Sequence, residues 1–309
     1  MSDPTKTDAL QASIKARLSR RGFLATGGAA GAAATVATLA VGPARAATQP
    51  TFDTSYENFT LPKFDADDSL VKIQKKGELV ICTSNDWPYS FLHPETKEFT
   101  GIDGDIIKAC AKMLNIGKVK VETVPFDGMI PGLLDGRFDM VGDSIHYTLK
   151  RAKVIDFSFP TYFYAEGLVV AKGNPLKVTK LTDLKGKNCG ALLGTNYAEW
   201  IQATPGVTFT GYKTWPAMAQ DIQNGRLDAA LHDQPIIAAT IAEHKDWPIE
   251  LVEAYVPEQA KNPAGYSVYG FRQGDVQLRA GFASAIMYLQ DRGEMAKILT
   301  KWGLGAVNN

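Results

Sequence analysis

The residue types that most often carry out chemistry in proteins are sparse and scattered in this chain of 309 residues. None of the four histidines has a short metal-site spacing such as HExxH: they are His93, His146, His232 and His244. No GxSxG, GxGxxG or Walker-type motif is present. We therefore expect no metal and no cofactor, and the pattern does not favour an enzyme.

The three cysteines, Cys82, Cys110 and Cys189, lack a CxxC pair and lie in apolar surroundings. They are interpreted as small buried side chains, with a disulfide between two of them as the alternative. The composition, 45% hydrophobic and 21% charged, is that of a folded globule long enough for two domains. Lysine plus arginine equals aspartate plus glutamate, at 33 each, so the net charge offers no attraction to nucleic acid.

The first residues have the features of an export signal. Ser19–Leu24, which contains Arg20 and Arg21, resembles the twin-arginine signal, and an Ala/Gly-rich stretch follows it. Small residues before Ala47 suit cleavage after Ala46, so we predict a signal peptide over 1–46, a polar lead over 47–66 and a periplasmic protein. A retained membrane anchor is the alternative, but the stretch has few Leu, Ile or Phe residues. The twin-arginine export machinery is one expected partner.

The rest of the chain alternates short apolar runs with helical patterns, which predicts an α/β fold. In the first half, strands are expected at Glu78–Thr83, Lys118–Val124 and Phe138–Val141. Helices are expected at Asp103–Leu114 and from Asp127 onward. The same alternation of strands and helices begins again with a strand at Cys189–Leu193. Helices are expected at Tyr197–Gln202, Trp215–Asn224 and Pro235–Glu243, and a further strand at Ala229–His232. Two lobes with parallel-rich sheets are indicated.

Two extended segments, Phe163–Ala171 and Tyr266–Phe271, are the predicted hinge crossings between the lobes. A helix over Val276–Asp291 closes the chain. We assign 67–165 with 268–309 to lobe 1 and 166–267 to lobe 2. Because parallel sheets bind ligands beyond the carboxyl ends of their strands, the loops after the predicted strands are expected to meet at one cleft.

The chain from about Asp68 to Trp302 resembles the periplasmic amino-acid-binding proteins of ABC transporters, of the lysine/arginine/ornithine and histidine type. The matching motifs keep the family's order: Gly101–Ile106, Pro125–Leu133, Gly136–Asp139, Thr148–Arg151 with Asp156–Ser158, Leu184–Lys187, Leu193–Thr195 and Gly225–Asp233. The resemblance implies a type II periplasmic binding fold, an amino-acid ligand and a membrane permease as partner.

The resemblance also assigns roles to single residues. Arg151 matches the arginine that clamps the ligand carboxylate, Thr195 a second carboxylate contact, and Asp233 the acid that accepts the ammonium. The alternatives are a surface arginine for Arg151 and a helix N-cap for Asp233. Trp87 and Phe126 match the aromatic pair around the ligand side chain, with core packing as the alternative.

Further polar positions match ligand contacts but depart from the family pattern. Ser84, Asp143 and Ser144 align with residues that touch the ligand's side chain or ammonium, yet Asp143 stands where serine is usual and Ser84 where an acid is common. His146 replaces a serine or threonine and can titrate near neutral pH. These departures give only a weak preference for a cationic or polar side chain.

The resulting hypothesis is the substrate-binding component of an ABC importer, which captures an amino acid or related zwitterion by domain closure. The alternative is an enzyme on the same fold, similar to cyclohexadienyl dehydratases. Gln234–Ile237 lacks the acidic residue expected shortly after Asp233 in such an enzyme.

Overall fold

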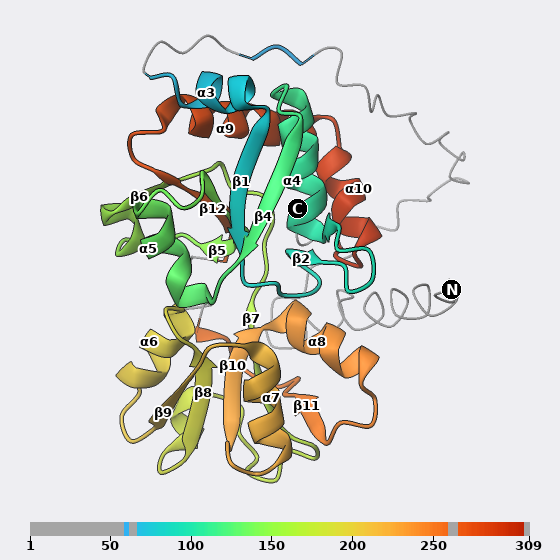
Figure 1. The fold of residues 1–309 in the computed structure, drawn as a ribbon. Helices are drawn as coiled ribbons and strands as arrows, with labels where there is room; N and C mark the ends of the chain where they lie inside the picture. Colours follow the sequence, from blue (N-terminus) through green and yellow to red (C-terminus); the bar gives the residue numbers. More distant parts are fainter. Residues whose placement is uncertain (1–58, 62–66, 259–264, 306–309) are drawn as a thin grey trace, which may run out of the picture.

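The computed structural model describes residues 59–61, 67–258 and 265–305, which form two lobes, one above the other in Figure 1. The predicted signal peptide and its cleavage site lie outside these residues. Each lobe has a five-stranded sheet flanked by helices. The α/β class and the two-lobed architecture predicted from the sequence are therefore confirmed.

Lobe 1 is built on a sheet with the strand order β4-β1-β5-β12-β6. Its strands are β1 (Glu78–Thr83), β4 (Lys118–Thr123), β5 (Met140–His146), β6 (Ile155–Phe157) and β12 (Ser267–Arg272). Its helices are α3 (Ser69–Lys76), α4 (Ile102–Met113), α5 (Met129–Leu134), α9 (Val276–Asp291) and α10 (Glu294–Lys301). Short 3-10 turns at Phe126–Gly128 and Arg151–Lys153 and a small hairpin, β2 (Phe91–Leu92) with β3 (Phe99–Thr100), complete it.

Lobe 2 repeats this plan with the order β11-β7-β10-β8-β9. Its strands are β7 (Glu166–Ala171), β8 (Asn188–Leu192), β9 (Thr208–Tyr212), β10 (Ala229–Asp233) and β11 (Ile249–Leu251). Its helices are α6 (Asn196–Ala203), α7 (Trp215–Gln223) and α8 (Gln234–Glu243), and a 3-10 turn covers Leu181–Leu184.

Both sheets are mixed. In lobe 1, β1 pairs in parallel with β4 and β5, whereas β12 runs antiparallel to β5 and β6. In lobe 2, β8 pairs in parallel with β9 and β10, whereas β7 runs antiparallel to β10 and β11. Apart from β9, the parallel strands are those that the repeated sequence pattern predicted, and the antiparallel strands β7 and β12 follow the two changes of lobe.

The crossings between lobes are shorter than the sequence suggested. Most of the first predicted hinge segment is β7, inside the second sheet, and most of the second is β12, inside the first sheet. The two chain segments that cross between the lobes lie side by side. Phe163 and Tyr266 form an isolated antiparallel bridge, and the Tyr164 N–H donates to the Gly265 carbonyl at 3.0 Å. Their apolar, β-prone sequences reflect their places in the two sheets, and the chain crosses between the lobes in the residues between these sheets.

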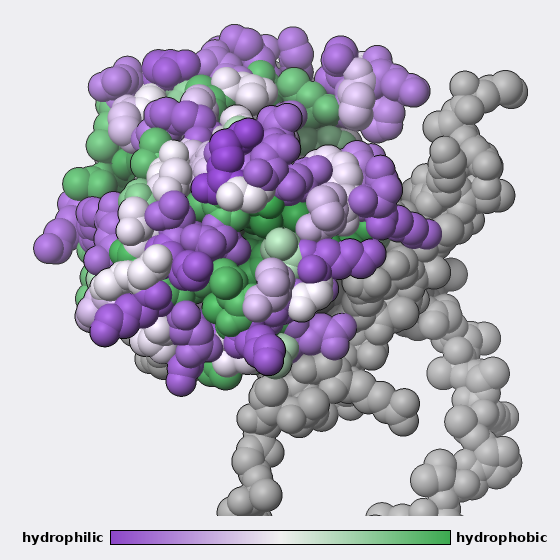
Figure 2. Space-filling model, turned by 90° about the horizontal axis from the view of Figure 1, so that it is seen from below, coloured by the Kyte–Doolittle hydropathy of each residue, from purple (hydrophilic) through white to green (hydrophobic). Residues whose placement is uncertain are grey.

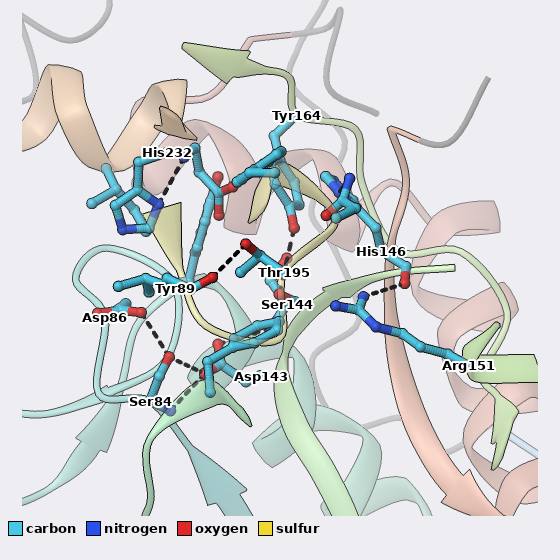
Figure 3. Close-up of a pocket in the computed structure, with 16 residues that line it drawn as sticks. Ser84, Asp86, Tyr89, Asp143, Ser144, His146, Arg151, Tyr164, Thr195 and His232 are labelled. Atoms are coloured by element: carbon cyan, nitrogen blue, oxygen red, sulfur yellow. Dashed lines mark hydrogen bonds between the residues drawn. The ribbon is translucent and has the colours of Figure 1, made fainter. Parts of the chain in front are cut away.

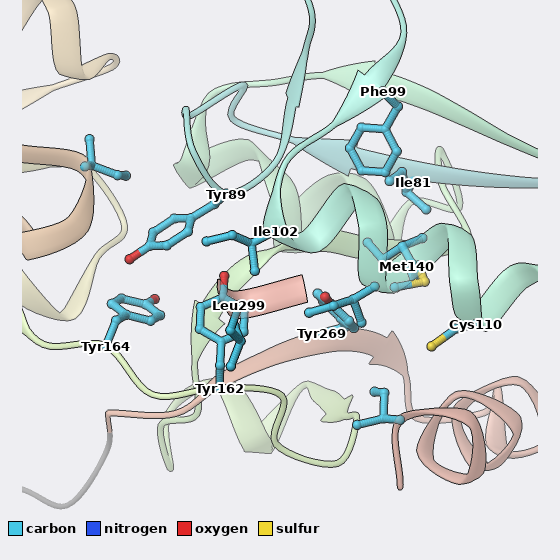
Figure 4. Close-up of a cluster of buried hydrophobic side chains, with 14 of the residues drawn as sticks. Ile81, Tyr89, Phe99, Ile102, Cys110, Met140, Tyr162, Tyr164, Tyr269 and Leu299 are labelled. Carbon is cyan, nitrogen blue, oxygen red and sulfur yellow. The ribbon is translucent and has the colours of Figure 1, made fainter. Parts of the chain in front are cut away.

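The core of lobe 1 explains why its helices form where they do. Ile102, Ile106, Ile107, Cys110 and Met113 recur every three or four residues along α4 and are all buried against the sheet. Figure 4 shows this cluster continuing into four tyrosines, Tyr89, Tyr162, Tyr164 and Tyr269, which extend it toward the other lobe. Buried aromatic packing therefore reaches from the lobe 1 core to the lobe boundary.

One acidic residue lies inside this apolar cluster. The Asp103 carboxylate accepts hydrogen bonds from the Tyr269 hydroxyl at 2.9 Å and the Tyr162 hydroxyl at 3.1 Å. Burial raises the pKa of Asp103 well above its usual value. Tyr162 lies just before one crossing between the lobes and Tyr269 lies in β12, just after the other, so these two hydrogen bonds join both chain segments to α4.

Cys82, Cys110 and Cys189 are buried and unpaired, so the disulfide alternative is wrong.

Seen from the far end of lobe 2, polar residues cover most of the surface and apolar ones show in a central depression (Figure 2). Among the described helices, none has both the length and the apolar character needed to span a bilayer. Within the same residues, His, Cys, Asp and Glu form no group suited to a metal ion.

Candidate ligand-binding site

A cavity lies between the lobes, at the carboxyl ends of the central strands. The atom-free space of this cavity, counted with its open mouth, is about 390 Å³. The side chains that line it come from both lobes (Figure 3). They are Ser84, Asp86, Tyr89, Phe126, Asp143, Ser144, His146, Arg151, Tyr164, Leu192, Thr195, Asn196, Tyr197, His232, Asp233 and Ile236.

Eight of the nine residues singled out in the sequence line this one cavity; Trp87 does not. Trp87 is half-buried in a turn that is closed by a bridge between Asp86 and Ser90. The turn instead directs Tyr89 to the cavity wall, where Tyr89 lies 5.1 Å from the Tyr164 ring. Tyr89 and not Trp87 is therefore the aromatic side chain of this turn that lines the cavity.

The N-terminus of α4 holds this turn. The N–H groups of Ile102 and Asp103 donate to the carbonyls of Pro88 and Tyr89. Gly101 makes the close approach possible, because it has a φ of +111° and a Cβ there would lie 2.1 Å from the Tyr89 carbonyl oxygen. A glycine in the sequence thus fixes where Tyr89 points.

Arg151 reaches from lobe 1 to lobe 2. Its Nη1 donates to the His146 carbonyl at 2.6 Å and its Nη2 to the Gly194 carbonyl at 3.1 Å. Its guanidinium lies 5.3 Å from the centre of the Phe126 ring, a cation–π contact. These bonds leave further N–H groups of the guanidinium for a carboxylate at the cavity.

The Asp233 carboxylate comes from the end of β10 in lobe 2. Its Oδ1 accepts a hydrogen bond from the Tyr197 hydroxyl. Burial, together with the charges of Asp86 and Asp143, raises the pKa of Asp233 well above its usual value. Its side chain makes no cap bond to α8, which weakens the N-cap alternative.

Thr195 has a structural role beside the predicted one. Its hydroxyl donates to the Leu192 carbonyl at 2.6 Å and accepts from the Ala198 N–H at 3.2 Å, as a helix N-cap does. The cap begins α6, whose first turn brings Asn196 and Tyr197 to the cavity. The threonine signal in the sequence therefore marks a helix start as well as a candidate contact.

His146 is neutral in this site. Burial and the nearby Arg151 charge lower its pKa to about 3. Its ring stacks on Tyr164 with centroids 4.4 Å apart, and its Nδ1 lies 3.4 Å from the Asn196 amide nitrogen across the lobe boundary. The expectation that His146 titrates near neutral pH is wrong, because the closed cleft shields the ring from water.

Ser84 and Asp143 form a compact polar group at the end of β1. Asp143 Oδ2 accepts bonds from the Ser84 hydroxyl and from the Ser84 N–H, the latter at 2.6 Å, and its Oδ1 accepts from the Ser144 N–H at 2.9 Å. The Ser84 hydroxyl also lies 2.7 Å from Asp86 Oδ2. Burial raises the pKa of Asp143 to about 6, and burial together with the Asp143 charge raises that of Asp86 to about 7.

Three buried polar atoms of the cavity wall have no hydrogen-bond partner among the described residues: Tyr89 Oη, Ser144 Oγ and His232 Nε2. An unpaired buried polar group is costly, so these atoms indicate a polar ligand. Sequence reasoning missed eight lining residues: Asp86, Tyr89, Tyr164, Leu192, Asn196, Tyr197, His232 and Ile236. Asp86 and Asn196 are next in sequence to Trp87 and Thr195, which had been predicted as site residues, and this adjacency could have identified them.

The fold and the site together define a two-lobed binding protein with an enclosed polar cleft. The chain belongs to the bacterial extracellular solute-binding proteins, family 3, which match it over residues 79–305. The L-cystine-binding protein TcyJ of Escherichia coli is 28% identical over 77% of this chain and 87% of its own length. The lysine/arginine/ornithine-binding periplasmic protein of Escherichia coli is 31% identical over 66% of this chain and 79% of its own.

Solved structures agree on the fold. An ancestral arginine-binding protein bound to arginine has a TM-score of 0.66 at 29% identity, covering 73% of this chain and 98% of its own. A mutant arginine-binding protein from T. maritima has a TM-score of 0.69 at 22% identity, covering 76% and 98% respectively. These relatives are named as binding proteins and not as enzymes.

Proposed function

We propose that this protein is the substrate-binding component of an ABC importer and that its cleft holds an amino acid or a closely related zwitterion. The observation that carries the proposal is the joint placement of Arg151 and Asp233 in one enclosed cavity, on different lobes. A guanidinium binds a carboxylate with two parallel hydrogen bonds, and a carboxylate accepts an ammonium. Relatives named for cystine, arginine and histidine binding support an amino-acid ligand.

The proposal includes export and a membrane partner. The family's description as extracellular supports an exported protein, and the twin-arginine signal over 1–46 is our proposed route. A permease with its ATPase would then receive the ligand from the closed form. The enzyme alternative has no observation in its favour, since none of the matched relatives named above is an enzyme.

A thermal-shift screen of the chain from Ala47 onward against the common L-amino acids tests the function. A ligand at a hundred times its Kd stabilises the folded protein by about 2.7 kcal/mol, because it binds only the native state. We expect a clear rise of the melting temperature for at least one amino acid, and none for its amide or its deaminated analogue. If small carboxylates without an amine give the largest shift, amino-acid capture is the wrong function.

A further inference from the structure

His146 lies at the junction of the two lobes. It is the last residue of β5 in lobe 1 and is 2% exposed. Its ring stacks on Tyr164 and lies edge-to-face with the Tyr197 ring of lobe 2, with centroids 4.4 Å and 6.0 Å away. Its carbonyl accepts from Arg151, whose Nη2 donates to the Gly194 carbonyl of lobe 2 (Figure 3). The contacts of this one residue therefore connect the lobes.

The contact with Asn196 defines the state of the imidazole. Asn196 is the first residue of α6 in lobe 2, and its Nδ2 lies 3.4 Å from His146 Nδ1. An amide nitrogen can only donate, so Nδ1 accepts and carries no hydrogen. A protonated imidazole has hydrogens on both nitrogens and cannot accept this bond, and its positive charge would lie beside the Arg151 guanidinium. The closed arrangement therefore fits the neutral ring.

Opening the lobes would remove most of these surroundings. Asn196 and Tyr197 would move away with lobe 2, and water would reach the imidazole. A solvated histidine has a pKa of about 6.5. In the closed structure, burial and then the Arg151 charge lower the pKa of His146 to about 3. At mildly acidic pH the open protein would thus carry a proton on His146 that the closed protein cannot hold.

We propose that His146 is a positioning residue for lobe closure: the lobes close on its neutral imidazole only, so capture of an amino acid at mildly acidic pH releases one proton from this ring. The proposal rests on the ligand-driven closure proposed above. One N–H bond of the imidazolium breaks and its proton goes to solvent; no other bond changes. The serine or threonine of the family pattern does not titrate in this range, so the effect is particular to a histidine at this position.

The direction of the pH dependence follows from the two pKa values. Because the pKa is lower in the closed form, the contribution of His146 to closure is complete above about pH 6.5 and is lost as the pH falls. The loss approaches tenfold in affinity per pH unit below that value, which amounts to about thirtyfold at pH 5 relative to pH 8.

Other titratable groups face the same junction, and some act in the opposite direction. Burial raises the pKa values of Asp86, Asp143 and Asp233, so these carboxyls hold protons more tightly in the closed cavity than in water. The remaining titratable or charged groups around the junction are Tyr89, Asp127, Lys150, Arg151, Tyr164, Tyr197, Glu199 and His232. The contribution of His146 is therefore measured as a difference between wild type and a variant at this position.

His146→Asn is the diagnostic variant and His93→Asn its control. Asparagine keeps an acceptor oxygen close to the place of Nδ1 but does not titrate. His93 lies between β2 and β3 of the same lobe and does not line the cavity.

Titration calorimetry at pH 6.0 in two buffers of different ionisation enthalpy counts the protons released on binding. The probes are L-arginine and L-glutamine, for which relatives are named or solved with ligand and which do not titrate near this pH. Wild type and His93→Asn should each release about 0.75 proton more than His146→Asn does. Between pH 8 and pH 5, the ratio of the wild-type Kd to the His146→Asn Kd should rise about thirtyfold. A residue with a merely structural role would leave this ratio constant.

A direct measurement needs no ligand. Lys150 and Glu199 form an exposed ion pair across the lobe boundary, so Lys150→Cys/Glu199→Cys can be joined by a short bis-maleimide, and the native cysteines are buried. NMR then follows the imidazole signals of the four histidines. The His146 signal, assigned by its contact with the Tyr164 ring, should titrate at about pH 6.5 before crosslinking and stay neutral down to about pH 5 after it. This arm decides even if His146→Asn does not fold.

The outcomes separate the role of His146 from the function. Equal proton release and a constant Kd ratio for wild type and His146→Asn overturn this role and leave amino-acid capture intact. The same titration of the His146 signal with and without the crosslink also overturns it. If neither probe nor any other amino acid binds, the proposed function fails, and the crosslinked protein alone decides whether closure excludes the proton.

Discussion

At the scale of single residues, the proposed selection of a zwitterion rests on Arg151 and Asp233. Each is more than nine-tenths buried, and each has protein partners that fix its direction: two carbonyls for Arg151 and the Tyr197 hydroxyl for Asp233. A ligand carboxylate or ammonium placed there leaves water and gains one fixed partner. Removing that partner leaves the ligand charge buried and unpaired.

We therefore expect Arg151→Ala and Asp233→Asn each to weaken binding of the native amino acid by about thirtyfold to several thousandfold. Analogues identify which charge each residue binds. The amide of the ligand should bind wild type weakly and lose little further affinity in Arg151→Ala. The deaminated ligand should also bind wild type weakly, and Asp233→Asn should not lower its affinity. Calorimetry measures this once circular dichroism shows folded variants; a change below threefold for Asp233→Asn contradicts the ammonium assignment.

The sequence predicted which residues face the cavity well where a motif fixes the local backbone, and poorly where a turn determines the direction of the side chain. Asp143 and Ser144 lie within β5 and Arg151 in the 3-10 turn that follows it, and the family resemblance had assigned all three, although the strand was expected to end at Val141. Trp87 and Tyr89 lie in a turn whose direction depends on the contact with α4, 13 or more residues later in the chain. No local pattern encodes that contact, so the aromatic side chain facing the cavity was misassigned.

At the scale of elements, periodicity predicted the central strands and the long helices. β1 and α9 have the predicted bounds, and α4 begins one residue before its prediction. The sequence did not reveal the short α3, the edge strands β6, β9 and β11, or the final helix α10. These elements are short or only partly buried, so their hydrophobic patterns are brief, and tertiary packing decides their structure.

The loop after β8 offers an element-scale prediction, because Gly194 contacts the other lobe. Its φ is +80°, and a Cβ there would lie 3.0 Å from Asp127 Cα across the lobe boundary. Gly173 has a similar φ of +84° with open space around it. Alanine at either position should cost about 1 kcal/mol of stability, from the left-handed backbone.

Only Gly194→Ala should also weaken ligand binding, because the alanine methyl group would press against Asp127 of the other lobe in the closed form. Overpacking of this kind costs about 1–3 kcal/mol, or roughly 5- to 150-fold in affinity. Calorimetry on both variants separates the effects. Equal ligand affinity in Gly194→Ala and Gly173→Ala would mean that this contact does not limit closure.

At the scale of the whole molecule, the structure shows the lobes closed on each other. Among the described residues, two ion pairs cross the boundary, Lys150 with Glu199 and Lys213 with Asp127, and both lie at the exposed edge of the cleft. The lysine side chains are 78% and 59% exposed. Exposed pairs of this kind contribute little, because water and salt screen them. We therefore expect contacts made through a ligand to provide most of the closing free energy.

This balance predicts an open free protein and a closed complex. Small-angle scattering of the chain from Ala47 onward should show a smaller radius of gyration when the amino acid that binds most tightly in calorimetry is saturating, because ligand contacts to both lobes shift the population. The double variant Lys150→Gln/Lys213→Gln should still close, with each change weakening affinity by less than about fivefold. Free and saturated profiles that superimpose on the curve of this closed structure would show that the surface pairs and the buried Arg151 bridge close the lobes without a ligand.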